Sequence, residues 1–158
     1  MKNRVKQYSH QQRQALNTWT KLVRCVMSVG QSDYMIMTQH DLTPTQFGIL
    51  EVLYHKGTMC QKELGEKLLK SGGNITKVID NLERDNQVRR IRHEKDRRYF
   101  QIELTESGKK VIEDVFPKIM NNLVDNFSVI TLEEQKSLAD LCKRIGLNLK
   151  GEKNDSKS

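Results

Sequence analysis

Two stretches of this chain contain side chains that suit chemistry with phosphates. The first is HEKDRRYFQIELTESGKK (residues 93–110), where Asp96, Arg97 and Arg98 come together before an alternating strand. Guanidinium groups make strong, charge-assisted hydrogen bonds with phosphates, and a planar guanidinium can enter a narrow DNA minor groove. Asp96 would repel a phosphate unless it holds an arginine or a turn amide in place. A solvated hairpin tip is the alternative interpretation of the same charges.

The second stretch is SGGNITKVIDN (residues 71–81), where polar side chains recur opposite an apolar stripe. Asparagine can pair with two atoms of adenine, threonine can meet a thymine methyl group or a phosphate, and lysine can reach guanine or a phosphate. Small residues at the start leave the helix N–H groups open to a phosphate. An ordinary exposed helix face is the alternative. The candidate contact residues are Ser71, Gly73, Asn74, Thr76, Lys77 and Asn81.

The three cysteines, Cys25, Cys60 and Cys142, are odd in number and far apart. None belongs to a C-x-x-C motif, so no disulfide framework is predicted, and the chain is expected to be cytoplasmic. Cys60 precedes a predicted helix, and a thiol in that position can be sensitive to oxidation. An inert thiol is the alternative, and Cys25 and Cys142 are expected to pack as apolar side chains. Replacing Cys60 by serine would separate the two.

Motifs for catalysis or for metal binding are missing from the sequence. It has no H-E-x-x-H, no P-loop and no G-x-S-x-G, and its histidines form no compact ligand set. We therefore expect neither an enzyme nor a bound metal or cofactor.

Charge is distributed unevenly along the chain. The formal net charge is +7, from 27 basic and 20 acidic residues. Residues 1–32 contain six basic residues and no acidic one, and residues 88–98 contain six basic and two acidic residues. Two basic zones indicate a polyanionic partner, of which nucleic acid is the commonest. The N-terminus lacks the apolar segment of a secretory signal, and no run is long enough to span a bilayer.

Helices must position these groups. Apolar residues at spacings of three and four predict a long helix from residue 8 to about 38. A second helix begins at Thr43, which is expected to form a capping box with Gln46, and ends at Gly57. Its predicted inner face consists of Phe47, Leu50, Leu53 and Tyr54.

A helix-turn-helix and a hairpin follow. The two helices are predicted at about 61–68 and 73–86, with a glycine turn between them. Strands at Val88–His93 and Arg98–Leu104 are joined by Glu94–Arg97. The inward positions of the second strand are predicted to be Phe100, Ile102 and Leu104. A helix-turn-helix followed by a hairpin with a basic tip is a winged helix.

Two more helices complete the chain. Thr105 is expected to cap a helix running to about Phe127, with a kink at Pro117. The capping box TLEE (residues 131–134) opens a last helix, which is predicted to end at Gly146 before a frayed polar tail.

Residues 43–110 resemble the MarR (multiple antibiotic resistance regulator) family of winged-helix repressors. The resemblance lies in LTPTQFGIL, QKELGEKL, SGGNITKVIDNLERDNQVRR and DRRYFQIELTESGKK, and the flanking helices match in order and length. It implies a mainly α fold with a small β-hairpin wing, and a homodimer bound to a pseudo-palindromic operator in double-stranded DNA. Arg98 would enter the minor groove while Asp96 steadies it. The implied regions are an N-terminal dimerisation helix (1–42), a winged helix (43–104), C-terminal dimerisation helices (105–150) and a polar tail (151–158).

Three positions depart from the usual family pattern. Two glycines in SGGN shift the expected base contacts toward Asn74, Thr76 and Lys77. Asn86 stands where a glycine often ends the recognition helix, so we expect it to adopt the left-handed conformation. Cys60 stands where serine or threonine commonly caps a helix.

The predicted function is therefore a DNA-binding transcriptional regulator, a repressor released by a small-molecule effector. Candidate pocket residues are Trp19, Val23, Phe47 and Phe116, which could equally be plain core. One alternative is a repressor that senses thiol oxidation through Cys60. Another is a winged-helix module that binds proteins and not DNA. The salt dependence of duplex binding would distinguish this module from a DNA-binding regulator, because DNA binding through lysine and arginine weakens steeply as salt rises.

Overall fold

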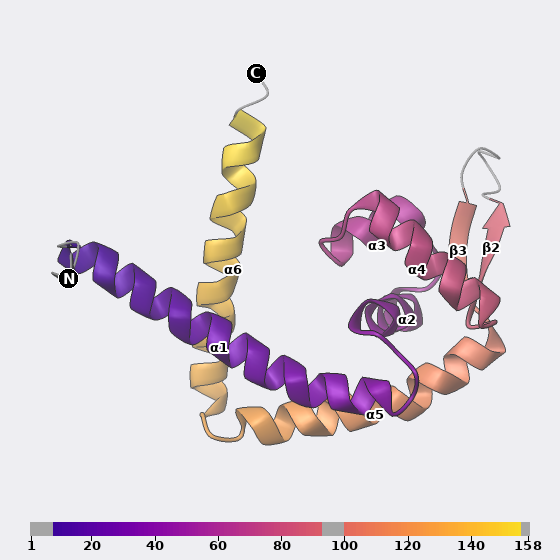
Figure 1. The fold of residues 1–158 in the computed structure, drawn as a ribbon, viewed down its shortest axis with the longest axis horizontal. Coiled ribbons are helices and arrows are strands. Elements are labelled where there is room, and N and C mark those ends of the chain that lie inside the picture. The colour runs from indigo at the N-terminus through magenta and orange to yellow at the C-terminus, as the bar shows by residue number, and fades with distance from the viewer. Residues whose placement is uncertain (1–7, 93–99, 156–158) are drawn as a thin grey trace, which may run out of the picture. The chain divides into compact units, whose positions relative to one another are not determined.

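The protein is described by a computed structural model, which covers residues 8–92 and 100–155 and the side chains up to residue 148 (Figure 1). Its chain contacts form two units, residues 1–120 and residues 121–158, and each is described by itself. The elements are α1 (His10–Thr38), α2 (Pro44–Lys56), β1 (Met59–Cys60), α3 (Gln61–Lys67), α4 (Gly72–Arg84), β2 (Val88–Arg92), β3 (Phe100–Leu104), α5 (Glu106–Phe127) and α6 (Leu132–Asp155). The expected fold class, mainly helical with a small sheet, is confirmed.

Local capping determines where the first two helices begin. Ser9 and Gln12 form a capping box at the start of α1, in which the Ser9 N–H donates to Gln12 Oε1 at 2.8 Å. Thr43 and Gln46 do the same for α2, as the sequence predicted, and the Thr43 N–H donates to Gln46 Oε1 at 2.9 Å. Gly57 ends α2 with a φ of 76°, a conformation that suits glycine.

The core of the first unit lies between α2, α4, the sheet and the first half of α5. Its fully buried side chains include Ile49, Leu50, Leu64, Ile75, Ile79, Leu82, Val88, Ile102, Ile112 and Val115. Burial of each such side chain contributes about 1.5–3 kcal/mol. The predicted inner face of α2 is wrong at Tyr54, which is 38% exposed. Ile49 takes the inner position, and the Tyr54 hydroxyl lies 3.5 Å from Glu113 on α5.

The sheet has three strands in the order β1-β3-β2, and both pairings are antiparallel. In β2 and β3, Val88 pairs with Leu104 and Arg92 with Phe100. The two-residue strand β1 was not predicted, because it is too short to show alternation. Phe100 is also a correction: it is 47% exposed, whereas Ile102 is buried. Ile102 lies between Met59 of β1 and Arg90 of β2, whereas Phe100 is paired with Arg92 of β2 and lies beyond the end of β1.

The start of α5 is bound to the turn that follows α4. The Thr105 hydroxyl donates to the Asn86 carbonyl at 2.6 Å and accepts from the Gly108 N–H at 3.0 Å. The Thr105 N–H donates to the Gln87 carbonyl at 3.2 Å. A Cβ atom at position 108 would lie 1.9 Å from the same Gln87 oxygen, so only glycine fits there. The helix then continues through Pro117 to Phe127.

In the second unit, α6 is longer than the sequence predicted. The capping box is confirmed, since the Thr131 N–H donates to Glu134 Oε2 at 2.8 Å and lowers the pKa of that carboxyl. The helix passes through Gly146 to Asp155, so the predicted end at Gly146 is wrong, and residues 151–155 of the expected frayed tail are helical. A single glycine costs a helix only about 1 kcal/mol, and no proline follows it to prevent continuation. Across the described residues, no helix has the length and apolarity needed to cross a membrane.

Candidate nucleic-acid interface

The helix α4 has one buried face and one polar face. Ile75, Ile79 and Leu82 are fully buried against the core. Asn74, Thr76 and Lys77 are exposed, and Asn81 is half-buried. The two faces predicted from the sequence are therefore present in the structure. Contact of the polar face with DNA stays a prediction.

The N-terminal end of α4 is open. Ser71 is the N-cap residue in an extended conformation, and its side chain makes no capping hydrogen bond with any described residue. Cβ atoms placed at Gly72 and Gly73 would have no described neighbour within 4 Å. The space beside the two glycines is therefore open, and the approach of a phosphate to the first N–H groups of the helix stays a prediction.

Thr76 is held by the preceding helix. Its hydroxyl accepts a hydrogen bond from Gln61 Nε2 at 2.5 Å and donates to the Gly72 carbonyl at 2.9 Å. With the hydroxyl proton in use, Thr76 can offer DNA its methyl group and a remaining lone pair. Gln61, which the sequence did not single out, joins α3 to α4 at this face.

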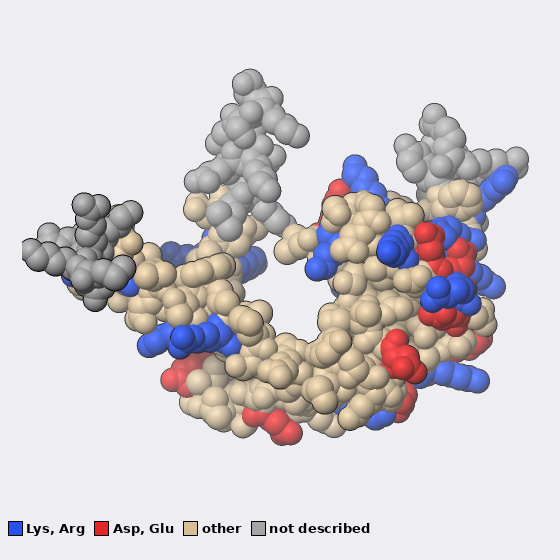
Figure 2. All heavy atoms as spheres, viewed as in Figure 1, with Lys and Arg blue, Asp and Glu red and all other residues tan. Residues whose placement is uncertain are grey.

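The other end of the polar face of α4 is bound to β2. Arg90 forms ion pairs with Asp80 and Glu83, and its backbone N–H donates to Glu83 Oε1 at 3.0 Å. Burial acts to lower the pKa of Arg90, but the hydrogen bonds and charges of the two carboxylates outweigh it and raise that pKa. Figure 2 shows the resulting mixture of basic and acidic side chains over α4 and the strands. Asp80 belongs to the polar stretch of residues 71–81, but the sequence alone did not identify its partner.

The predicted wing residues Asp96, Arg97 and Arg98 lie outside the described residues. The strands on either side are described, and they are joined across the sheet by an ion pair between Arg89 and Glu103. Arg92, the last described residue of β2, is exposed. The structure therefore supports the hairpin that leads to the wing and leaves the roles of its tip residues as predictions.

The turn between α4 and β2 adopts the conformation expected from the sequence. Asn86 has a φ of 53°, in the left-handed region, and its N–H donates to the Glu83 carbonyl at 3.0 Å. Asparagine tolerates this conformation better than most residues other than glycine. The left-handed conformation that the sequence predicted for Asn86 is therefore confirmed.

The three cysteines are all free. Cys60 is half-buried at the N-cap position of α3, and its N–H donates to Glu63 Oε2 at 2.9 Å. Cys25 and Cys142 are exposed, although apolar packing had been expected for both.

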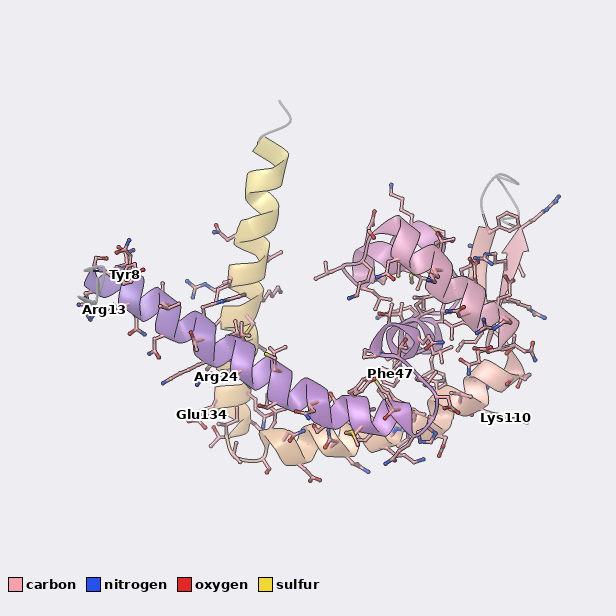
Figure 3. The ribbon with its side chains drawn as sticks, in the orientation of Figure 1. Tyr8, Arg13, Arg24, Phe47, Lys110 and Glu134 are labelled. Atoms are coloured by element: carbon pink, nitrogen blue, oxygen red, sulfur yellow. The ribbon has the colours of Figure 1, made fainter. Side chains whose placement is uncertain are left out.

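The four candidate pocket residues differ in exposure. Trp19 is 63% exposed, whereas Val23, Phe47 and Phe116 are half-buried. The Phe116 ring packs edge-on against His55, with ring centroids 4.8 Å apart. Figure 3 labels Phe47 on α2, together with Arg13 and Arg24 on α1. A pocket at these residues stays a prediction.

Comparison with known sequences identifies the family. The family described as Transcriptional regulator SarA/Rot matches residues 33–115, which is more than half of the chain. The HTH-type transcriptional regulator MhqR of Bacillus subtilis is 34% identical over 136 residues, which cover 86% of this chain and 94% of that protein. The HTH-type transcriptional regulator SarZ of Staphylococcus epidermidis is 33% identical over 70% of this chain and 72% of its own length.

Solved structures share the fold. AbsC, a MarR family transcriptional regulator from Streptomyces coelicolor, superposes with a TM-score of 0.82 at 22% identity, over 93% of this chain and 99% of that one. A MarR family protein from Bacillus stearothermophilus gives a TM-score of 0.66 at 25% identity, over 87% and 97% of the two chains. The chain therefore belongs to the SarA/Rot family of transcriptional regulators, and it has the winged-helix fold of the solved MarR family regulators.

Proposed function

We propose that the protein is a cytoplasmic homodimer that represses transcription by binding a pseudo-palindromic operator in duplex DNA. The observation that carries this proposal is the polar face of α4, which is exposed above a fully buried stripe and has an open N-terminal end. The role is one of binding and release, with no catalytic step. Release would follow when a small molecule occupies a pocket lined by Trp19, Val23, Phe47 and Phe116.

The geometry supports insertion of α4 into the major groove, which is about 12 Å wide and admits one helix. Asn74 would read a base edge, Lys77 would contact a phosphate or guanine, and the open helix end would meet the backbone. The proposed DNA-binding surface also includes Ser71, Gly73, Thr76 and Asn81. The wing residues Asp96, Arg97 and Arg98 would reach the adjacent minor groove.

Asn74→Ala and Lys77→Ala are expected to change different quantities. Loss of a base-reading asparagine should alter sequence preference, at about 1–3 kcal/mol for a good contact. Loss of a phosphate-contacting lysine should weaken binding to all sequences and lower the salt slope by about one. The measurement is duplex affinity at several salt concentrations, with Lys56→Ala on α2 as the control. If both variants bind like the wild type, α4 is not the helix that reads DNA.

The proposal of a dimer is based on large apolar side chains that are exposed to solvent in the single chain. On α1 these include Leu16, Trp19, Val26 and Met27, each 59–67% exposed. On α6 they include Leu141, Ile145 and Leu147, each 52–54% exposed. Apolar patches of this kind on a small domain mark a surface that a partner covers.

Light scattering is expected to give twice the chain mass of 18.4 kDa across a dilution series. The double change Leu141→Asp with Ile145→Asp should shift the protein toward a monomer and weaken operator binding, because two buried charges oppose association. The control is Lys143→Asp, which changes an exposed charged residue of the same helix. A wild-type monomer that still binds the operator tightly would contradict the dimer.

A further inference from the structure

Arg90 lies at the centre of a three-residue cluster that joins β2 to α4. Its two terminal nitrogens contact different carboxylates: Nη2 lies 2.5 Å from Asp80 Oδ1, and Nη1 contacts Glu83 Oε2. Glu83 uses its other oxygen to accept the backbone N–H of the same arginine at 3.0 Å. The Arg90 side chain is only 22% exposed, against 56% for Asp80. Arginine is suited to this arrangement because its planar fork makes several hydrogen bonds in a fixed geometry.

This cluster is not arranged to bind phosphate. One carboxylate contacts each terminal nitrogen of the guanidinium. The cluster of one arginine and two acids therefore has a formal charge of −1. A negative cluster on the helix that faces DNA repels the DNA backbone. The carboxylates therefore weaken the electrostatic attraction between this surface and DNA. If they favour DNA binding, they must do so by holding Arg90 in one orientation.

The connection that the cluster spans is short and turns sharply. Between α4 and β2 the chain passes through Asp85, Asn86 and Gln87, with Asn86 in the left-handed conformation. Leu82 and Val88 are buried on either side of this turn, but apolar contacts are not directional. The ion pairs of Arg90 add directional contacts between α4 and the strand that leads to the wing.

We propose that Arg90 is a positioning residue for DNA recognition, which Asp80 and Glu83 hold so that α4 and the wing are presented to DNA at one fixed angle. The proposal rests on the proposed DNA-binding function. A base-reading helix and a wing can engage two grooves together only if their relative angle is correct. Loosening that angle harms operator binding, in which both must fit, more than non-specific binding, which needs only charge.

The test uses variants that keep shape and change charge. Asp80→Asn and Glu83→Gln each make the protein more basic by one charge. They are expected to lower affinity for the operator selected by the wild type by about tenfold, the order of one lost charge-assisted hydrogen bond. Affinity for a random duplex should stay equal or rise, and the salt slope should not fall. Arg90→Lys, which keeps the charge but loses the fork, should show the same loss on the operator alone.

Arg89→Ala is the matched control, because Arg89 is the neighbouring residue on β2 and pairs with Glu103. If Arg90 only contributed charge, Arg90→Ala and Arg89→Ala would weaken operator and random duplex alike, and Glu83→Gln would bind better than the wild type. Either result would overturn the proposal. The melting temperature of each variant is measured as a control for folding. If Arg90→Ala does not fold, the operator and random-duplex affinities of Glu83→Gln and Arg90→Lys test the proposal instead. Failure of the proposed function looks different, because the wild type itself would then not prefer any duplex.

Discussion

Replacing Gly108 by alanine is expected to destabilise the protein by about 3 kcal/mol or more, at the upper end of the range for overpacked sites. The added Cβ would lie 1.9 Å from the Gln87 carbonyl oxygen and 2.8 Å from its carbon, which are backbone atoms and cannot rotate away. Relief requires the start of α5 to move from the turn after α4. That movement would break the hydrogen bonds of Thr105 to Asn86 and Gln87.

Thermal unfolding at a fixed protein concentration measures this effect. For a chain of this size, 3 kcal/mol corresponds to a lowering of the melting temperature by about 6–12 °C. Gly73→Ala is the control, since a Cβ there meets nothing described within 4 Å and alanine favours helix. Equal melting temperatures for Gly108→Ala and the wild type would mean that α5 does not approach the turn this closely.

Arg98→Ala is expected to lower operator affinity by about 100-fold, because the proposed homodimer would lose two minor-groove contacts of about 1–3 kcal/mol each. The fold should survive, since the described strands of the hairpin are anchored in the core by the buried residues Val88 and Ile102. Asp96→Ala should also weaken binding, although it makes the protein more basic. The carboxylate is proposed to hold Arg98 or a turn amide in the entering geometry.

The sign of the Asp96 effect separates this role from simple electrostatics. Glu94→Ala removes the same charge two residues earlier in the sequence, which makes it the matched control. A purely electrostatic surface would bind better after either change. The proposed role requires Asp96→Ala to bind more weakly while Glu94→Ala does not. Improved binding by Asp96→Ala, with an unchanged melting temperature, would show that the wing is only a basic patch.

The features that could be predicted from the sequence are those that neighbouring residues determine. Thr43 and Gln46 cap α2 through contacts three residues apart, so the motif TPTQ is sufficient to locate the start of the helix. The two faces of α4 follow from helical periodicity alone. Asn86 was predictable because few residues other than glycine adopt its conformation.

The features that were missed depend on contacts between distant segments. Strand β1 exists because Met59 and Cys60 pair with β3, some forty residues later in the chain. Alternation predicted Phe100 to be inward, but it does not show that β1 pairs beside Ile102 and ends before Phe100, which is exposed. Glycine often ends helices and so predicts an end at Gly146, yet α6 continues through it to Asp155. The partners of Arg90 were hidden in a charged stretch that resembles a solvated surface.

Selection of bound duplexes from a random pool tests most directly whether α4 and the wing read DNA sequence. We predict enrichment of an inverted repeat whose half-sites are centred about 10 base pairs, or a multiple of that spacing, apart, as expected for a two-fold dimer. The selected duplex should bind at least about 1000-fold more tightly than a scrambled one at physiological salt. A pool without an enriched repeat, or equal affinity for selected and scrambled duplexes, would contradict the proposed function.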